Sequence, residues 1–350
     1  MMKSQQHNRL VLLFIFSLLC LNLSSLCFAR TWRVPSECPT LKAGCDSASY
    51  GDTVLVAPGI YERNTEPETW WLLKPGVSMV SEAGPEVTFI EICNISLAVG
   101  VNEEGVRFSG FTVRYGSGPD CEVPPVANYG VWCTATDAVI ENCFIEGFYV
   151  GILMEVPSLQ WWKPVFRNNH IRGCSRGISL EGVMDSGRPY LEGNVITECF
   201  DGVFVIDSSP NLAGNIVTHC IEAGLYYAGH CGGNCKRNVI ANNDSYGVLI
   251  LSADPPLAVP DFNGGLMPAD ANDFYGNGSY DIKYPYSDEG GVMAKWNWWG
   301  SDCPDFSDKV SGRVYYEPWT DSSHTLRMDT EACENATKPS TWSEIKALFR

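Results

Sequence analysis

The feature that most constrains this chain is a repeat of 21 to 27 residues through its middle. Each unit has an asparagine, an apolar residue two positions later, and a glycine eight or nine positions later. Apolar residues also follow the glycine directly and two positions beyond that. Agreement of five units in six columns indicates a structural repeat. The anchors are Asn142, Asn169, Asn194, Asn215 and Asn238, continued by Asn272 and Asn297.

The repeat predicts a stack of short parallel strands. Apolar residues alternate over four or five positions, which is the period of a strand. The units are too short for a strand, a crossover helix and a second strand, so each unit is one coil. Coils then stack ~4.8 Å apart, and an asparagine column can form a hydrogen-bonded ladder. We expect the glycines to mark turns between strands, where a positive φ or a close backbone approach is required.

Composition and charge exclude other classes. The chain has 45% hydrophobic and only 19% charged residues, which excludes disorder over most of its length. Its formal charge of −17 excludes a nucleic-acid partner, because neutralising phosphates needs a basic surface. A polyanionic partner is also disfavoured unless a cation bridges the two.

The first 29 residues read as an export signal. Lys3 and Arg9 precede an apolar run over residues 10–21, and small residues precede a cleavage site after Ala29. No second apolar run is long enough to span a membrane. We therefore expect a secreted, periplasmic or cell-surface protein, and a monomer.

The cysteines suit an oxidising compartment. Fifteen cysteines less Cys20 and Cys27 of the signal leave 13, so at least one is unpaired. Cys174, Cys199 and Cys220 each lie five residues after an anchor asparagine, which favours buried free thiols. Sequence alone does not give the connectivity. Pairs near enough in sequence to be candidates are Cys38/Cys45, Cys133/Cys143, Cys231/Cys235 and Cys303/Cys333.

Three stretches carry a resemblance to a known family. They are WRVP at residues 32–35 with GDTVLVAPGIYE at 51–62, the repeat block itself, and WNWWG at 296–300 with VYYEPW at 314–319. In these the chain resembles right-handed parallel β-helix repeat proteins of the pectin-lyase-like superfamily, in particular the exported bacterial ones. The resemblance implies an all-β fold, a single-stranded solenoid with a short N-terminal capping helix around residues 40–48.

The sequence divides the chain into three parts. We expect a signal peptide at 1–29, the β-helix domain at 30–325, and a tail at 326–350 that ends in a short amphipathic helix over residues 341–350. The tryptophan-rich stretch around residues 296–299 is suited to close the second end of the solenoid.

The catalytic motifs of active superfamily members are mostly missing. No adjacent pair of aspartates occurs, and Asp254-Pro255-Pro256 stands where an epimerase would need Asp-Pro-His. No spacing indicates a zinc site. The chain is therefore expected to bind or display at the cell surface or in the periplasm, with a polysaccharide or cell-surface glycan as ligand. The alternative is a polysaccharide lyase, epimerase or glycoside hydrolase that acts on the side of the β-helix.

The repeat register places a set of polar residues along the coils. Glu155 and Glu181 should stack in adjacent coils, and stacked carboxylates require a raised pKa, hydrogen bonds or a bound Ca²⁺. Lys163 and Arg188 should form a second row on the same flank. Solvated surface ion pairs are the alternative reading. The candidate catalytic residues are Glu155, Glu181, Asp207, Lys163, Arg188 and His230.

Aromatic residues supply the candidate binding surface. The row two positions after each column glycine should point outward, and it includes Phe204 and Tyr226. Such a row is either a platform for sugar rings or is buried under inserted loops. Trp161, Trp162 and Tyr190 are close in sequence to the polar residues and complete the candidate substrate-binding set.

Overall fold

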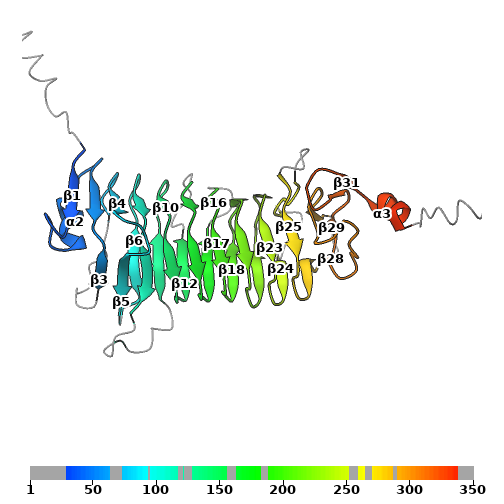
Figure 1. Ribbon diagram of the computed structural model, residues 1–350, viewed down its shortest axis with the longest axis horizontal. Coiled ribbons are helices and arrows are strands. Elements are labelled where there is room, and N and C mark those ends of the chain that lie inside the picture. The colour runs from blue at the N-terminus through cyan, green and yellow to red at the C-terminus, as the bar shows by residue number, and fades with distance from the viewer. Residues whose placement is uncertain are drawn as a thin grey trace, which may run out of the picture.

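The protein is an elongated solenoid of three parallel β-sheets, as the sequence predicts. The structure is a computed structural model that describes residues 29–63, 73–93, 95–116, 121, 128–155, 163–182, 188–251, 259–264, 270–286 and 290–337. Each of the three large sheets has nine strands, and successive strands of one sheet come from successive coils. The coils stack along the long axis of the molecule (Figure 1). The predicted signal peptide lies outside the described residues.

Each coil from β4 to β24 contributes one strand to each of three sheets, which we call A, B and C. Sheet A contains β1 (Thr31–Val34), β2 (Thr53–Val56), β4 (Ser78–Ser81), β7 (Arg107–Ser109), β10 (Val139–Glu141), β13 (Val165–Arg167), β16 (Tyr190–Glu192), β19 (Asn211–Ala213) and β22 (Asn234–Lys236). Sheet B contains β3 (Gly59–Arg63), β5 (Thr88–Ile92), β8 (Thr112–Tyr115), β11 (Phe144–Glu146), β14 (His170–Arg172), β17 (Val195–Thr197), β20 (Ile216–Thr218), β23 (Val239–Ala241) and β25 (Asp273–Tyr275). Sheet C contains β6 (Leu97–Val101), β9 (Tyr129–Cys133), β12 (Val150–Glu155), β15 (Arg176–Glu181), β18 (Asp201–Ile206), β21 (Ala223–Ala228), β24 (Tyr246–Leu251), β26 (Tyr280–Tyr284) and β28 (Val310–Gly312).

The apolar columns of the repeat form the core. Phe166 pairs with Leu191 and Leu191 with Leu212 in sheet A, and all three side chains are buried. In sheet C, Ile178 pairs with Val203 in the same way. In most strands of sheets A and B, the residues beside these core residues are at least partly exposed, so burial there follows the strand period found in the sequence.

Buried asparagines join successive coils where sheet A passes into sheet B. The Asn194 amide nitrogen donates to the Oδ1 atom of Asn215 at 2.9 Å, and its own Oδ1 accepts from the Asn169 amide at 3.0 Å. The same bonds continue through the remaining members. The buried series is Asn169, Asn194, Asn215, Asn238, Asn272 and Asn297.

The prediction that Asn142 belongs to this series was wrong. Val139 pairs with Val165, which places Cys143, not Asn142, opposite Asn169. The Cys143 main-chain N–H accordingly donates to the Asn169 side chain at 3.1 Å. Asn142 is exposed and has a φ of 53°, matching Asn168, whose φ is also 53°. It occupies the left-handed turn position one residue earlier, where asparagine is tolerated.

The column glycines lie inside the strands of sheet C, so the prediction that they mark turns was wrong. Close backbone approach, the other reason given for them, does apply. A Cβ atom on Gly202 would lie 2.5 Å from the carbonyl oxygen of Gly224 in the next coil. On Gly177 it would lie 2.5 Å from that of Gly202. The coils therefore stack this closely only without a side chain at this column.

A short helix closes the N-terminal end of the solenoid, as predicted. Helix α2 (Leu41–Ser47) begins after Thr40, whose hydroxyl accepts from the Ala43 N–H at 3.1 Å. Leu41 and Cys45 are buried, and Gly44 lies against Val54. Figure 1 shows α2 at the end opposite α3 (Thr330–Thr337). Neither helix is long and apolar enough to cross a membrane, and no other described helix is.

Aromatic rings close the C-terminal end. Trp299 is fully buried and stacks on Phe274 with ring centroids 5.1 Å apart, which agrees with the predicted role of the tryptophan-rich stretch. Phe306 continues the cluster between Trp299 and Trp319. Outside the three sheets, two short pairs add to this end. They are the parallel pair β27 (Val292–Met293) with β29 (Val314–Tyr315) and the antiparallel pair β30 (Trp319–Thr320) with β31 (Arg327–Met328).

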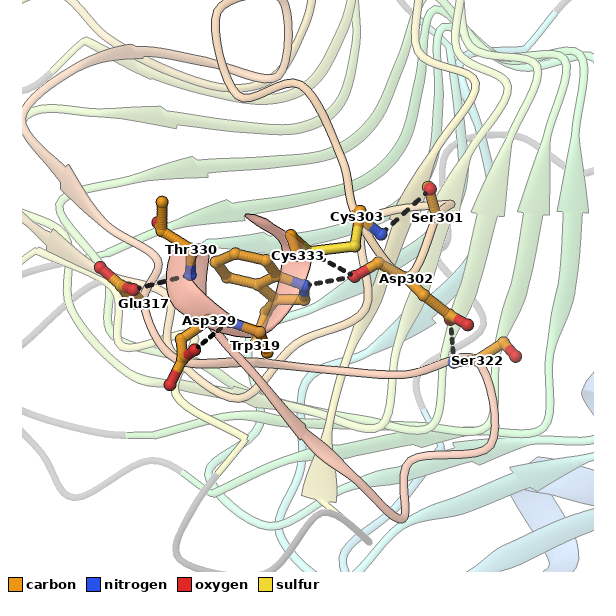
Figure 2. The surroundings of a disulfide bond; sticks show 10 residues. Ser301, Asp302, Cys303, Glu317, Trp319, Ser322, Asp329, Thr330 and Cys333 are labelled. Carbon is orange, nitrogen blue, oxygen red and sulfur yellow. Dashed lines mark hydrogen bonds between the residues drawn. A yellow bond between two sulfur atoms is a disulfide. The ribbon is translucent and has the colours of Figure 1, made fainter. Parts of the chain in front are cut away.

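A disulfide attaches the start of the tail to this end. Figure 2 shows the Trp319 ring beside the bond between Cys303 and Cys333, and the indole N–H donates to the Asp302 carbonyl at 2.9 Å. Strand β31 and Cys333 both lie beyond the boundary predicted at residue 325. The amphipathic segment predicted at residues 341–350 lies outside the described residues.

The disulfide predictions are confirmed for one pair of four. Cys303 and Cys333 are bonded, and a second disulfide joins Cys93 to Cys121, a pair that the sequence analysis missed. The predictions for the other three pairs were wrong. Nine described cysteines are free and buried: Cys38, Cys45, Cys133, Cys143, Cys174, Cys199, Cys220, Cys231 and Cys235.

These pairings predict the labelling of the protein by an alkylating reagent. Without reduction, the folded protein should take up essentially no label at the nine buried thiols, because burial keeps them from the reagent and raises the pKa of most of them. After denaturation without reduction, mass spectrometry should find nine labelled cysteines after Ala29 and two intact disulfides. Thirteen labelled cysteines would contradict the two disulfides.

Candidate functional site

The candidate site lies on the outer face of sheet C, at the middle of the solenoid. The outward row runs through Leu153, Ser179, Phe204, Tyr226 and Leu249, which pair in register along the sheet. Leu153, Ser179 and Leu249 are buried, whereas Phe204 and Tyr226 are partly exposed. The accessible part of the row is therefore its aromatic centre.

Phe204 and Tyr226 form a stacked pair covered at one end by a cation. Their ring centroids are 5.0 Å apart and their planes differ by 21°. The guanidinium carbon of Arg176 lies 3.5 Å from the centre of the Phe204 ring. Contact between a guanidinium and an aromatic face is favourable and fixes the positions of both groups. Burial raises the pKa of Tyr226, and the carboxylates of Asp201 and Glu222 add to the shift.

Glu181 holds Arg176 in this position. Its Oε1 atom accepts from Arg176 at 3.2 Å and from the hydroxyl of Ser179 at 3.0 Å. The two charged side chains are 27% and 38% exposed, so both also reach the solvent. A ring, a cation and a carboxylate thus meet within two adjacent coils.

A buried carboxyl group lies next to Arg176 in the register of sheet C. Asp201 pairs with Arg176 in the sheet register and is 5% exposed. Its Oδ1 atom is buried and has no hydrogen-bond partner among the described residues. Burial raises the pKa of Asp201 to about 6; Arg176 opposes the shift and Glu222 adds to it. This carboxyl group therefore titrates near neutral pH and can donate or accept a proton there.

Two more residues extend the polar surface past Tyr226. Lys283 follows Leu249 in the outward row, and its ammonium group donates to the Tyr246 hydroxyl at 3.0 Å. The same group lies 4.8 Å from the centre of the Tyr246 ring. Tyr246 belongs to the column of Arg176 and Asp201. The face therefore has a cation near an aromatic ring at two places.

The structure brings some of the predicted catalytic residues together. Glu155 pairs with Glu181 in adjacent coils, as the register predicts, but Glu155 is exposed at the end of its strand. Asp207 follows β18 with a φ of 50°, and its carboxylate accepts from the main-chain N–H of His230 at 2.8 Å. The His230 ring Nδ1 atom is buried without a partner among the described residues. Asp207 and His230 thus form a contact between neighbouring turns.

Lys163, Arg188 and Tyr190 lie elsewhere. Lys163 and Arg188 are exposed and immediately precede the region of β13 and β16, so they belong to the sheet A side of their coils. In the described part of the chain, no hydrogen bond or ion pair joins either of them to Glu181. Tyr190 is the first residue of β16 in sheet A and is 44% exposed, apart from Phe204 and Tyr226 in sheet C. Trp161 and Trp162 lie outside the described residues.

The sequence analysis missed Arg176 and Asp201, although the repeat contained a signal for them. Both residues stand directly before a column glycine, in adjacent units, and they have opposite charges. Two opposite charges in one column of a parallel stack are neighbours across the sheet. Among the described residues, no group of three or more histidine, cysteine or carboxylate side chains is placed to hold a metal ion. The residues described here therefore identify no ligand set for the predicted Ca²⁺.

Known β-helix proteins share the fold of this chain at low sequence identity. A family model described as a right-handed β-helix region matches residues 98–259. No curated protein sequence matches the chain. The A-module of the Azotobacter vinelandii mannuronan C-5 epimerase AlgE4 aligns over 77% of this chain and 91% of its own length, with 13% identity and a TM-score of 0.51.

Two other structures are similar at lower TM-scores. The Dettilon tailspike protein aligns over 78% of this chain, which spans 57% of the tailspike chain, with 11% identity and a TM-score of 0.47. The catalytic domain of a GH87 α-1,3-glucanase in complex with nigerose aligns over 85% of this chain and 68% of its own length, with 11% identity and a TM-score of 0.38. The epimerase alignment and the family model agree with the three-sheet parallel solenoid described above.

Proposed function

Because this chain is a right-handed parallel β-helix protein of the pectin-lyase-like fold, we propose that it binds polysaccharide along the outer face of sheet C. The observation that carries the proposal is the stacked pair of Phe204 and Tyr226, with Arg176 held over it by Glu181. The partly exposed edges of the two rings offer apolar surface to the C–H groups of a sugar. The adjacent charged groups offer hydrogen-bond partners to its hydroxyl groups.

The geometry of the stack suits an extended ligand. Phe204 and Tyr226 belong to adjacent coils, so the row repeats every ~4.8 Å along the solenoid axis. This repeat is close to the length of one pyranose unit in an extended chain. We propose that the polysaccharide runs parallel to the axis, with successive sugars over successive coils. The ligand class rests on this chemistry, since the distant structural relatives inform only the fold.

The test is a binding measurement with matched aromatic variants. Wild-type protein would be screened on a glycan array, and the affinity for the best glycan measured by calorimetry. Phe204→Ala and Tyr226→Ala should each weaken binding by about tenfold, as expected for the loss of an aromatic contact. Tyr190→Ala is the control, because it removes an exposed ring from sheet A and should leave the affinity unchanged. Equal losses in all three variants would contradict a site on sheet C.

We further propose that binding takes place outside the cytoplasm. Two disulfides are suited to an oxidising compartment, where a solenoid can display its faces to cell-surface or secreted glycans. The predicted signal peptide fits this location. In this role the stacked coils act as a rigid support that fixes the spacing of the binding residues.

A second candidate function is catalysis at the same face. It is favoured by Asp201, a buried carboxyl group with a pKa of about 6 beside the cation Arg176. A carboxyl group that titrates near neutral pH can act as a general acid or base in a lyase, an epimerase or a glycoside hydrolase. If the protein is such an enzyme, Asp201→Asn should retain binding to the glycan found above and lose turnover by at least about a hundredfold. Equal turnover by this variant and the wild type would exclude Asp201 as the catalytic group.

A further inference from the structure

A second concave surface lies away from sheet C, along the line where sheet A passes into sheet B. This sheet A–B groove has a volume of about 660 Å³. It runs over six consecutive coils from β7 to β22, a length of ~24 Å at the ordinary spacing between strands. Its lining residues are Arg107, Glu141, Asn142, Arg167, Asn168, Glu192, Gly193, Ala213, Gly214 and Arg237.

One buried carboxylate orients two arginines in the groove. The Glu141 side chain is 3% exposed and lies between Arg107 and Arg167, which are 46% and 44% exposed. The Nε atom of Arg107 donates to one oxygen of Glu141 and that of Arg167 to the other, both at 2.5 Å. Burial opposes ionisation of Glu141, but Arg167 and Arg107 outweigh it and hold its pKa below the usual value. Each guanidinium has five N–H donors, so both arginines retain donors for a ligand.

The floor of the groove is the backbone that joins sheet A to sheet B. Residues at this line have left-handed backbone, including Asn142, Asn168 and Gly214. Nothing lies within 4 Å of the position that a Cβ atom on Gly214 would take. The main-chain N–H groups of this line already donate to carbonyls of the next coil, as Asn168 does to Glu192 and Gly214 to Lys236. The groove therefore offers side-chain guanidiniums and open space, and no free sheet edge.

We propose that the sheet A–B groove is a second glycan site, and that it binds an acidic polysaccharide through Arg107, Arg167 and Arg237. Guanidinium groups bind carboxylate and sulfate through paired hydrogen bonds. Three cations against Glu141 and Glu192 give the lining a net charge of +1, and Asp270, which pairs with Arg237 at 3.8 Å, is balanced by Lys236. The formal charge of −17 disfavours a polyanion on the chain as a whole, so this groove is a local exception. This site is separate from the proposed site on sheet C and does not depend on it.

An acidic glycan fits the groove better than a peptide or a nucleic acid. A peptide that adds a strand needs unpaired main-chain groups, and those along this line are already bonded to the next coil. A nucleic acid needs a broad basic surface, whereas the three arginines lie in a single narrow groove. Arg107, Arg167 and Arg237 lie on the first, third and sixth of the six coils. A sugar chain with one acid group on each unit can place an acid group near each of these arginines.

The probe is an oligogalacturonate, compared with its carboxyl-reduced neutral form of the same length. Calorimetry at low salt should detect binding of the acidic oligomer only. A triple variant, Arg107→Gln, Glu141→Gln and Arg167→Gln, removes both guanidiniums without leaving a buried carboxylate unpaired, and should weaken binding at least about tenfold. Arg237→Ala, which changes an exposed residue, should weaken it severalfold and serves if the triple variant does not fold.

A variant of the opposite sign makes the test sharper. Glu192→Gln removes an exposed carboxylate from the groove and should tighten binding about twofold. Arg172→Gln, in an exposed ion pair on sheet B, should leave the affinity unchanged. A sulfated galactan used as a second probe distinguishes sulfate from carboxylate as the acid group. Failure of both acidic probes to bind, or equal binding of the neutral oligomer, would overturn the proposal, whatever the outcome on sheet C.

Discussion

Replacing Asn194 with alanine is expected to lower the free energy of unfolding by about 3 kcal/mol or more. The Asn194 side chain is fully buried and makes four hydrogen bonds. Its removal leaves the main-chain N–H of Asn169 and the carbonyl of Phe166 buried without these partners. Each buried polar group that loses its partner costs ~1–3 kcal/mol, which is more than the net value of the bonds themselves.

Chemical denaturation measures this loss, and the chain provides a matched control. Asn142→Gly changes an asparagine of the same repeat at an exposed turn position outside the ladder. Glycine adopts its left-handed φ of 53° without strain, so the stability should change by less than about 1 kcal/mol. Binding of any glycan to sheet C should persist in both folded variants. Equal destabilisation by the two substitutions would contradict the ladder as the structure defines it.

The contrast between Asn142 and Asn194 shows what a repeat does and does not reveal. Strand period, coil length and the apolar columns follow from side-chain chemistry, so the solenoid and most of its core could be predicted. The alignment of a single coil with its neighbours could not be predicted as reliably. Two adjacent asparagines, Asn168 and Asn169, occupy the turn and the ladder, and a lone Asn142 fits either position by residue type. The hydrogen bonds between coils decide the choice.

The disulfides show a different limit. Cys303 and Cys333, 30 residues apart, could be proposed as a pair only because they are near in sequence. Cys93 and Cys121 are 28 residues apart, and loops between and beyond the strands bring them together. Cysteines close in sequence, such as Cys133 and Cys143, follow apolar columns and lie buried in the core. Nearness in sequence is therefore a poor guide when each coil turns through three sheets.

The candidate site was predictable where it depends on register and not where it depends on loops. The row of Phe204 and Tyr226 follows from alternation within the strands of sheet C. Lys163 and Arg188 were assigned to the same flank as Glu181, but a connection to another sheet separates them from it. The inward or outward direction of a strand residue repeats every two positions, whereas the path of a connection has no such period.

The second large effect is expected from Asp201→Asn and depends on pH. Burial raises the pKa of Asp201 from the usual 3.8 to about 6, so the ionised carboxylate is less stable in the folded than in the unfolded chain. Below pH 3.8 the Asp201 carboxyl group is protonated in both the folded and the unfolded chain, and the folded state carries no penalty. As the pH rises through about 6, the folded chain must ionise this buried group, and the stability of the fold decreases. The difference corresponds to ~3 kcal/mol at pH 8. Asparagine remains neutral throughout, so the variant should be more stable than the wild type at pH 8 by about 2 kcal/mol and nearly equal to it at pH 4.

Thermal unfolding of both proteins across this pH range measures the effect. Asp244→Asn, an exposed aspartate two coils beyond Asp201, should change the stability by less than about 0.5 kcal/mol at either pH. No gain at pH 8 for Asp201→Asn would mean that Asp201 is ionised without cost in the folded protein, which would remove the reason to consider it as an acid or base. A gain would show that the chain retains a carboxylate that lowers its stability. A group kept at such a cost, beside Arg176 and the aromatic pair, is better explained by chemistry at this face than by the stability of the solenoid.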